Sequence, residues 1–309
     1  MKKLTWSLLF LAACSSSTSL SELSEDGRSS FVHVVGSSTL YPLTQKAASE
    51  FASDQRQVRI SVTGTTKGFA DLCSKQAAIV AASRSMNEDE KSECKKSKIN
   101  VIGFPLAFDA ITLVAHPENT WAKYLTVSEL RRIWSPESQG RLVNWNQIRE
   151  GFPDHPLVLL GPGRDSGTFD SFSERIVGRR GALRRDYQSS EDDYLIVHEI
   201  AKNQGALGFI GLSYAQSKPE GLIIVAVGES AHDAVLPSVQ TVQSGSYKDL
   251  ARLTYLYTSS AALARADRKE FLEHYLQLTM TKGKSMGFVP LSGQEFAASL
   301  AQLKEVNHE

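Results

Sequence analysis

The sequence has few of the residues from which metal and redox centres are built. Only three of its 309 residues are cysteines and seven are histidines. The cysteines form no CxxC pair, and the histidines form neither an HxxxH nor an H-E-x-x-H pattern. Because structural and catalytic metal sites draw mainly on such clusters, we expect neither a metal site nor a cofactor.

A net charge is also lacking, since 34 basic residues balance 34 acidic ones. Proteins that bind nucleic acid need a basic face, so we expect no nucleic-acid partner. A small anion needs only a few local donors, and its binding stays compatible with this balance. The apolar content of 41% supports real hydrophobic cores. The length predicts about two domains.

Long apolar runs are scarce, and the clearest one is Leu4–Ala13 near the N-terminus. Two lysines precede it, and its length of about ten residues is too short to span a bilayer. It ends in Leu-Ala-Ala-Cys, which predicts a lipoprotein signal peptide at residues 1–13, a lipidated Cys14 and a flexible tether at 14–30. The expected location is the periplasm or cell surface, anchored to a membrane. An ordinary cleaved signal with a chance cysteine is the alternative.

Two further cysteines, Cys73 and Cys94, remain in the exported chain. Two thiols in an exported protein usually pair. We expect a disulfide that closes a loop of about 20 residues and stabilises the fold by about 3 kcal/mol. Two buried free thiols are the alternative.

Short apolar runs alternate with stretches of helical period. Strands are predicted at Phe31–Val35, Val58–Val62, Ala78–Ala82, Ile99–Phe104, Ile111–Ala115, Leu157–Leu160, Ala206–Ile210 and Ile223–Val227. Helices are predicted at Leu43–Phe51, after a cap at Ser128, and over the apolar stripe from Phe271 to Met280. This alternation is typical of an α/β fold with parallel sheets.

Three segments rich in glycine and hydroxyl residues each follow a predicted strand and precede a helix. They are Gly36–Thr39, Thr63–Gly68 and Gly161–Thr168. A helix N-terminus exposes unpaired N–H groups, glycine permits a close backbone approach, and hydroxyls add neutral donors. Together they favour a cradle for a phosphate-like anion. One such loop alone is more often a simple helix cap, whereas three in one chain form a stronger signal.

A dianion also needs a fixed positive charge. Arg84 follows the buried strand Ala78–Ala82, and Arg164 lies within the third loop. The fork of an arginine suits a tetrahedral oxyanion. Either residue could instead be a surface arginine.

Patterns of rival functions are incomplete. Asp165-Ser166-Gly167 has the look of a serine nucleophile, but it lacks a second glycine and no recognisable His/Asp partners accompany it. Gly283-Lys284-Ser285 ends like a P-loop, but position 278 is leucine. The run Glu191–Asp193 could hold a cation, although a solvated or helix-capping cluster is the more common explanation. We therefore expect no catalytic residues.

Several spaced motifs resemble one known family in the same order. Gly36-Ser-Ser-Thr-Leu-Tyr-Pro42 and Gly161-Pro-Gly-Arg-Asp-Ser-Gly-Thr-Phe-Asp170 are similar to two loops of the phosphate-binding proteins (PstS type) of bacterial ABC phosphate importers. The likeness continues through Leu125–Trp134 and Gly205–Ile210, and it covers nearly all of residues 31–292.

The resemblance implies a two-lobed periplasmic-binding-protein fold, in which each lobe is a mixed, mostly parallel sheet flanked by helices. Residues 31–107 and 216–309 would form the first lobe, and residues 108–215 the second. The protein would be a monomer that captures inorganic phosphate in the interlobe cleft and delivers it to a membrane permease without catalysing a reaction. Other oxyanions such as sulfate or tungstate are the alternative, followed by an exported phosphoester hydrolase.

By motif position, the resemblance implies a set of phosphate ligands and charge partners. These are Ser38, Thr39, Thr65, Thr66, Arg84, Arg164, Ser166, Gly167 and Thr168. The sequence departs from the family at Arg84, where the best-known members have an aspartate that accepts the proton of hydrogen phosphate. Asp165 is a candidate substitute. The third loop is also shorter than the family's Arg-x-x-Gly-Ser-Gly-Thr form.

Overall fold

The computed structural model describes residues 31–53, 56–216 and 221–306. The predicted signal peptide (1–13), the tether (14–30) and Cys14 therefore lie outside the described residues. The strands are β1 Phe31–Gly36, β2 Gln57–Val62, β3 Ile79–Ala82, β4 Val101–Ala115, β5 Tyr124–Thr126, β6 Val158–Pro162, β7 Gln188–Ser190, β8 Ala206–Gly211, β9 Ile223–Gly228, β10 Ala251–Ser259 and β11 Val289–Pro290.

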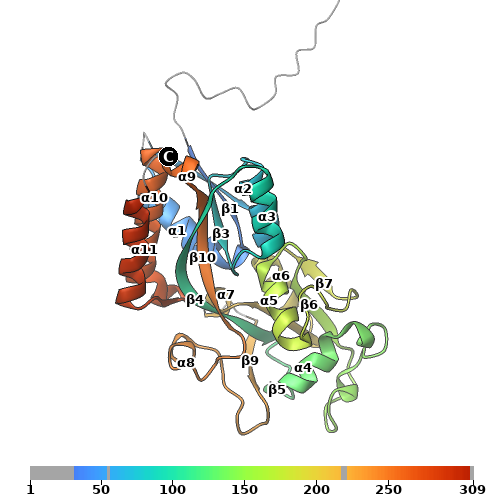
Figure 1. Cartoon of the computed structure of the whole chain (residues 1–309). Helices are drawn as coiled ribbons and strands as arrows, with labels where there is room; N and C mark the ends of the chain where they lie inside the picture. The colour runs from blue at the N-terminus through green and yellow to red at the C-terminus, as the bar shows by residue number, and fades with distance from the viewer. Residues whose placement is uncertain (1–30, 54–55, 217–220, 307–309) are drawn as a thin grey trace, which may run out of the picture.

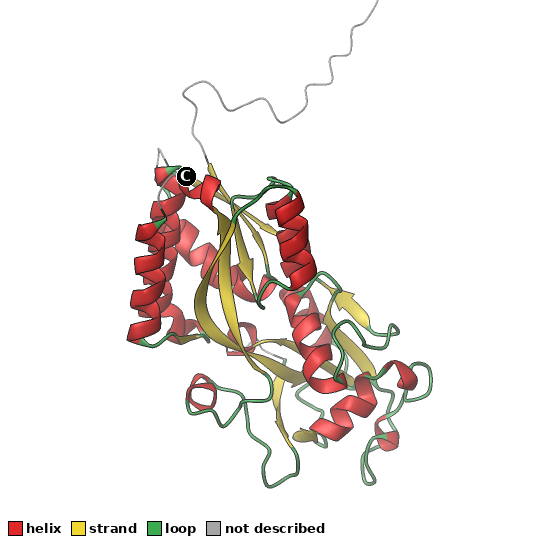
Figure 2. Cartoon of the chain, viewed as in Figure 1, coloured by secondary structure: helices red, strands yellow, loops and turns green. Residues whose placement is uncertain are grey.

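Helices lie between most of these strands, which confirms the α/β prediction (Figure 2). They are α1 Tyr41–Phe51, α2 Thr65–Cys73, α3 Glu88–Lys96, α4 Val127–Trp134, α5 Gly167–Phe172, α6 Asp193–Ile200, α7 Leu212–Gln216, α8 Val239–Gln243, α9 Ser260–Leu263, α10 Ala266–Lys282 and α11 Gly293–Glu305. None of the helices in the described part of the chain has both the length and the apolar character that crossing a membrane requires.

One mixed sheet connects the strands in the order β2-β1-β3-β10-β4-β8-β6-β7, with β9 and β11 also paired to β4 and β5 paired to β9. Within each half the neighbours β1–β2, β1–β3, β6–β7 and β6–β8 are parallel. The pairings of β4 and β10 are antiparallel. These two strands are therefore the elements that join one half to the other (Figure 1).

The inner strands of the first half, β1 and β3, are mostly buried on both faces, whereas the outer strand β2 has no buried residue. Val32 and Val34 of β1 pack in one apolar cluster with α1, α10 and α11, whereas Val35 packs in another with α2 and α3. This alternation follows from the period of two in a strand. Figure 1 shows α1, α10 and α11 on one side of the sheet and α2 and α3 on the other. Strands buried on both faces explain the continuous apolar runs in the sequence.

The second half is built around aromatic side chains. Trp134 contacts Phe172 and Phe209 edge to face, and the rings of Phe172 and Phe209 stack at 4.0 Å between centroids. The same cluster includes Trp145 and residues of α4 and α5. A smaller cluster packs α6 against β6 and β8.

Two local predictions are wrong. The strands expected at Ile99–Phe104 and Ile111–Ala115 form one long strand, β4. Pro105 does not interrupt it, because it lies beside an irregularity in the pairing with β10, where sheets tolerate proline. The helix α4 begins one residue after Thr126, and Thr126 rather than Ser128 caps it, in a reciprocal capping box with Glu129.

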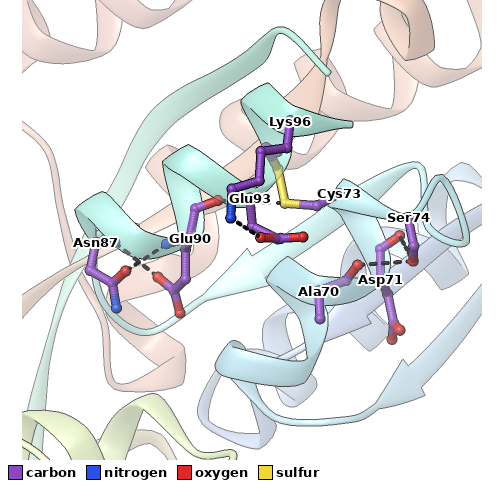
Figure 3. The surroundings of a disulfide bond; sticks show 9 residues. Ala70, Asp71, Cys73, Ser74, Asn87, Glu90, Glu93 and Lys96 are labelled. Atoms are coloured by element: carbon purple, nitrogen blue, oxygen red, sulfur yellow. Dashed lines mark hydrogen bonds and ion pairs between the residues drawn. A yellow bond between two sulfur atoms is a disulfide. The ribbon is translucent and has the colours of Figure 1, made fainter. Parts of the chain in front are cut away.

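The disulfide prediction is confirmed. Cys73 at the end of α2 is bonded to Cys94 in α3 (Figure 3). Both residues are buried in the cluster that α2 and α3 form against the sheet. The bond therefore fixes these two helices to each other.

Candidate anion-binding site

The three glycine- and hydroxyl-rich loops meet at one place between the halves of the molecule. The carbonyl of Gly36 in the first loop accepts hydrogen bonds from the N–H groups of Thr63 (3.1 Å) and Gly64 (2.9 Å) in the second. The N–H of Thr66 in the second loop donates to the carbonyl of Asp165 in the third (3.0 Å). The loops are far apart in the sequence and form one backbone network.

Close packing at this meeting point requires glycine at two positions. Gly64 has φ +81°, and a Cβ added there would lie 2.4 Å from the carbonyl oxygen of Asp165. A Cβ on Gly167 would lie 2.4 Å from Oγ of Ser83 and 2.8 Å from Oγ1 of Thr65. The second and third loops therefore approach as closely as their backbones allow.

Two threonines from opposite halves lie in direct contact. Oγ1 of Thr39, from the first loop, is 2.9 Å from Oγ1 of Thr168, at the start of α5. Nη2 of Arg252 donates to both hydroxyls, at 3.2 Å and 2.8 Å respectively. All three residues are buried. A guanidinium thus lies where the first and third loops meet.

Arg252 comes from β10, one of the two connecting strands, and it is held by a carboxylate on the other. It pairs in register with Asp109 of β4. Its Nε and Nη2 donate to Oδ2 of Asp109 at 3.1 Å and 2.9 Å. Burial raises the pKa of Asp109, and the charge of Arg252 opposes that rise. The buried Nη1 of Arg252 has no hydrogen-bond partner among the described residues, so it is a donor available to an anion.

Ser38 lies beside a second buried carboxyl group. Its hydroxyl donates to Oδ2 of Asp193 (3.3 Å), and its carbonyl accepts from the hydroxyl of Tyr214 (2.7 Å). Asp193 is completely buried at the start of α6. Burial raises the pKa of Asp193 to about 7, although the charge of Arg252 and the hydrogen bond from Ser38 lower it. This group therefore changes charge near neutral pH.

Arg84 is nearby, but its hydrogen bonds are used elsewhere. Nε donates to Asp170 at 2.7 Å, and the two terminal nitrogens donate to both carboxylate oxygens of Glu90 at 2.8 Å and 2.7 Å. The remaining donors reach the carbonyl of Ser85 and the hydroxyl of Thr66. An arginine has five N–H donors, and all five are occupied here.

The other predicted site residues divide into two groups. Thr65 contacts Ser83 (3.1 Å between hydroxyl oxygens), and Ser166 is a buried cap whose hydroxyl accepts from the N–H of Thr168. These lie at the meeting point with Ser38, Thr39 and Gly167. Thr66 belongs instead to the surroundings of Arg84, and Arg164 is exposed, so the structure does not bring Arg164 together with the others.

The acidic run Glu191–Asp193 does not act as one cluster. Asp192 is exposed, and its side chain caps α6 through the N–H of Tyr194. Glu191 accepts from the N–H of Asp165, and Asp193 faces Ser38. Across residues 31–53, 56–216 and 221–306, no group of acidic, histidine or cysteine side chains is arranged to hold a metal ion.

A groove of about 800 Å³ opens beside Ser38. It is lined from the first half by Tyr41 and Val62 and from the second half by Glu191, Asp192, Tyr194 and Tyr214. Of the residues at the meeting point of the loops, only Ser38 lines the groove.

Sequence reasoning missed three contributors: Arg252, Asp109 and Asp193. The segment Ala251–Ser259 alternates in burial, but its inward face carries Arg252 and Thr254, and this hides the apolar period of a strand. Asp193 is part of a run that looks like a solvated cluster.

Comparison with known proteins assigns the chain to a family. The PBP superfamily domain matches residues 15–277. The chain belongs to the PBP superfamily. Protein SphX of Synechocystis sp. is 36% identical over 292 residues, which cover 94% of this chain and 84% of SphX.

Two other similar proteins carry more descriptive names. The phosphate-binding protein PstS of Staphylococcus saprophyticus is 28% identical, with 88% of this chain and 83% of PstS covered. A crystal structure of a possible phosphate binding protein from Planctomyces limnophilus is 30% identical and superposes with a TM-score of 0.63, covering 91% of this chain and 99% of that one. The two-lobed α/β architecture of the superfamily is thus the architecture of this chain.

Proposed function

We propose that this protein is an extracytoplasmic binding protein that captures inorganic phosphate between its lobes and delivers it to an ABC importer. The observation that carries the proposal is Arg252, a buried guanidinium that contacts one hydroxyl from each lobe and keeps one nitrogen without a partner. Relatives named as phosphate-binding proteins support the same assignment. They also favour a binding protein over the phosphoester hydrolase.

The proposed site combines one fixed cation with neutral donors. Arg252 supplies the charge that the sequence had suggested for Arg84 or Arg164. Hydroxyls and backbone groups of the three loops supply the remaining donors, namely Ser38, Thr39, Thr65, Ser166, Gly167 and Thr168. Such preformed donors replace the water that a phosphate loses on burial.

The lobe boundaries remain a proposal. Val225, Val227, Tyr247 and Leu250 pack in the same cluster as the core of residues 108–215. We therefore assign the segment from 221 to 250 to the second lobe, together with 108–215, and leave 31–107 and 251–306 in the first. The strands β4 and β10 would then form the hinge, since their pairing runs from Val101 to Ala110 and from Ala251 to Ser259.

Lipid anchoring at Cys14 and a monomeric state belong to the same proposal. The support for the anchor is the Leu-Ala-Ala-Cys motif after a short apolar run. Palmitate labelling of cells that express the wild-type chain or the Cys14→Ser variant tests it. Label on both forms, or on neither, would contradict the lipoprotein assignment.

Calorimetric titration of the purified chain tests the proposed ligand. Inorganic phosphate should give saturable binding, and sulfate or tungstate under the same conditions should bind much more weakly. Tighter binding of either competitor would reassign the ligand to that oxyanion. Turnover of a chromogenic phosphate ester would instead support the hydrolase.

A further inference from the structure

Arg84 is surrounded by more negative charge than it carries. Its guanidinium bridges the carboxylates of Glu90 and Asp170, and all three side chains are largely buried. The distances are 2.7 Å to each carboxylate. Because every N–H donor of Arg84 is occupied, this group binds protein rather than a small anion.

The partners of Arg84 come from both lobes. Glu90 lies on α3 and Thr66 on α2, and these helices pack against the first half of the sheet. Asp170 lies on α5, whose Phe169 and Phe172 are part of the core of the second half. Opening of the lobes about β4 and β10 would separate Arg84 from Asp170 but leave Arg84 bound to Glu90.

We propose that Arg84 is a closure latch: its ion pair with Asp170 stabilises the closed form and slows the release of the captured anion. This inference rests on the proposed function. Asp170 lies two residues after Thr168, so the latch fastens α5 next to the proposed ligand residues without touching the ligand. Arg84 therefore positions α5 and is not itself a ligand.

Glu90 sets the strength of the latch. In the open form Glu90 would still satisfy two nitrogens of Arg84, so Arg84 is never an isolated buried charge. In the closed form the negative charge of Glu90 opposes that of Asp170, and burial together with Glu90 raises the pKa of Asp170 while Arg84 lowers it. Closure is therefore favoured by one interaction and opposed by another, which keeps it reversible.

The disulfide holds one side of this arrangement in place. Cys94 follows Glu90 by one turn on α3, and its bond to Cys73 ties α3 to α2, the helix that carries Thr66 (Figure 3). The capping box between Asn87 and Glu90 fixes the start of the same helix. The first-lobe half of the latch is thus rigid, and of the contacts of Arg84 only the one with Asp170 has to break on opening.

Release kinetics of inorganic phosphate test the latch. Asp170→Asn is nearly isosteric and should raise the off rate about tenfold, since a charged hydrogen bond is lost, with little change in the on rate. Arg84→Met should raise the off rate similarly, and the double variant should resemble either single variant. If Arg84 were a ligand instead, Arg84→Met would raise the off rate by the same factor in the wild type and in Asp170→Asn. Such additivity, or an unchanged off rate in Asp170→Asn, would overturn the latch.

Glu90→Gln should change the off rate in the opposite direction. Without the charge of Glu90, Arg84 gains more from Asp170 on closure, so the off rate should fall below that of the wild type. A general loss of packing would raise it, and that result would count against the proposal. If the wild-type chain shows no saturable phosphate binding, the proposed function fails rather than the latch.

The ion pair between Arg149 and Glu129 is a matched control. Its shortest distance is 2.6 Å, both side chains are mostly buried, and the pair lies within the second lobe. Glu129→Gln should lower thermal stability and leave both rate constants of phosphate binding unchanged. A similar rise in off rate in this control would attribute the effect of Asp170→Asn to destabilisation alone.

Discussion

Arg252 and Asp109 face each other across the two strands that join the lobes, at register positions of β10 and β4. The carboxylate holds the guanidinium at 2.9 Å and keeps the buried pair neutral as a unit. The same guanidinium reaches Thr39 and Thr168, which belong to different lobes. A charge at the hinge is therefore connected to both walls of the proposed site.

Replacement of Arg252 by lysine tests its role as the cation of the site. Lysine keeps the charge and the pairing with Asp109, but it lacks the planar fork that spans both threonines. We expect phosphate affinity to fall by about 1–3 kcal/mol, measured by calorimetry. Arg184→Lys is the control, since Arg184 is also buried and pairs with Asp186 within the second lobe. It should lower the melting temperature without changing affinity. Equal affinity in Arg252→Lys and the wild type would remove Arg252 from the site.

Gly167→Ala tests the close approach of the second and third loops. The added methyl group would lie 2.4 Å from the hydroxyl of Ser83, so the loops would have to move apart. We expect phosphate binding to weaken by about 1–3 kcal/mol, because shifted donors no longer fit one anion. Gly293→Ala is the control, since nothing lies within 4 Å of a methyl group there. If the two variants bind alike, the approach of the loops has no part in binding.

The strands with uniform burial and the loops that follow them could be predicted from the sequence. Ile79–Ala82 is buried at every position, and such strands produce unbroken apolar runs. The loops after β1, β2 and β6 contain glycine and hydroxyl residues because a backbone that approaches another loop closely tolerates little else. Both features are local, and a single sequence shows local features well.

The cation of the site depends on long-range pairing and could not be predicted in this way. Arg252 is 213 residues from Thr39, and only the antiparallel pairing of β10 with β4 brings it inward. For Arg84, the local sequence suggested a role that long-range contacts exclude. Its position after a buried strand favoured a ligand role, whereas Glu90 and Asp170, which occupy it, come from two other helices.

Loss of the disulfide tests the contribution of the crosslink to stability. Cys73 and Cys94 are separated by 21 residues, and a crosslink of that length restricts the unfolded chain by about 3 kcal/mol. The double variant Cys73→Ser/Cys94→Ser should have a free energy of unfolding lower by about that amount, and it should therefore unfold at a lower denaturant concentration. Reduction of the wild type should have the same effect, and it should leave the double variant unchanged. A response of the double variant to reductant would point to a different thiol.

The pH dependence of stability tests the burial of Asp193. Its pKa is raised to about 7, mainly by burial, whereas an unfolded aspartate titrates near 4. The folded state therefore holds this proton more tightly between these values. The stability that neutral Asp193 contributes to the fold is fully present below the unfolded pKa. It declines as the pH rises toward the folded pKa of about 7 and is lost above it.

Asp193→Asn isolates this contribution from those of other carboxyl groups, such as Glu191, whose pKa is also raised to about 7. The asparagine side chain is neutral at every pH and can still accept the hydrogen bond from Ser38. We expect the variant to be more stable than the wild type at about pH 8, with a difference that shrinks toward about pH 5. Denaturant titrations of both proteins across this range measure the difference. A constant difference would mean that Asp193 stays charged throughout, because the positive charge of Arg252 outweighs the cost of burial.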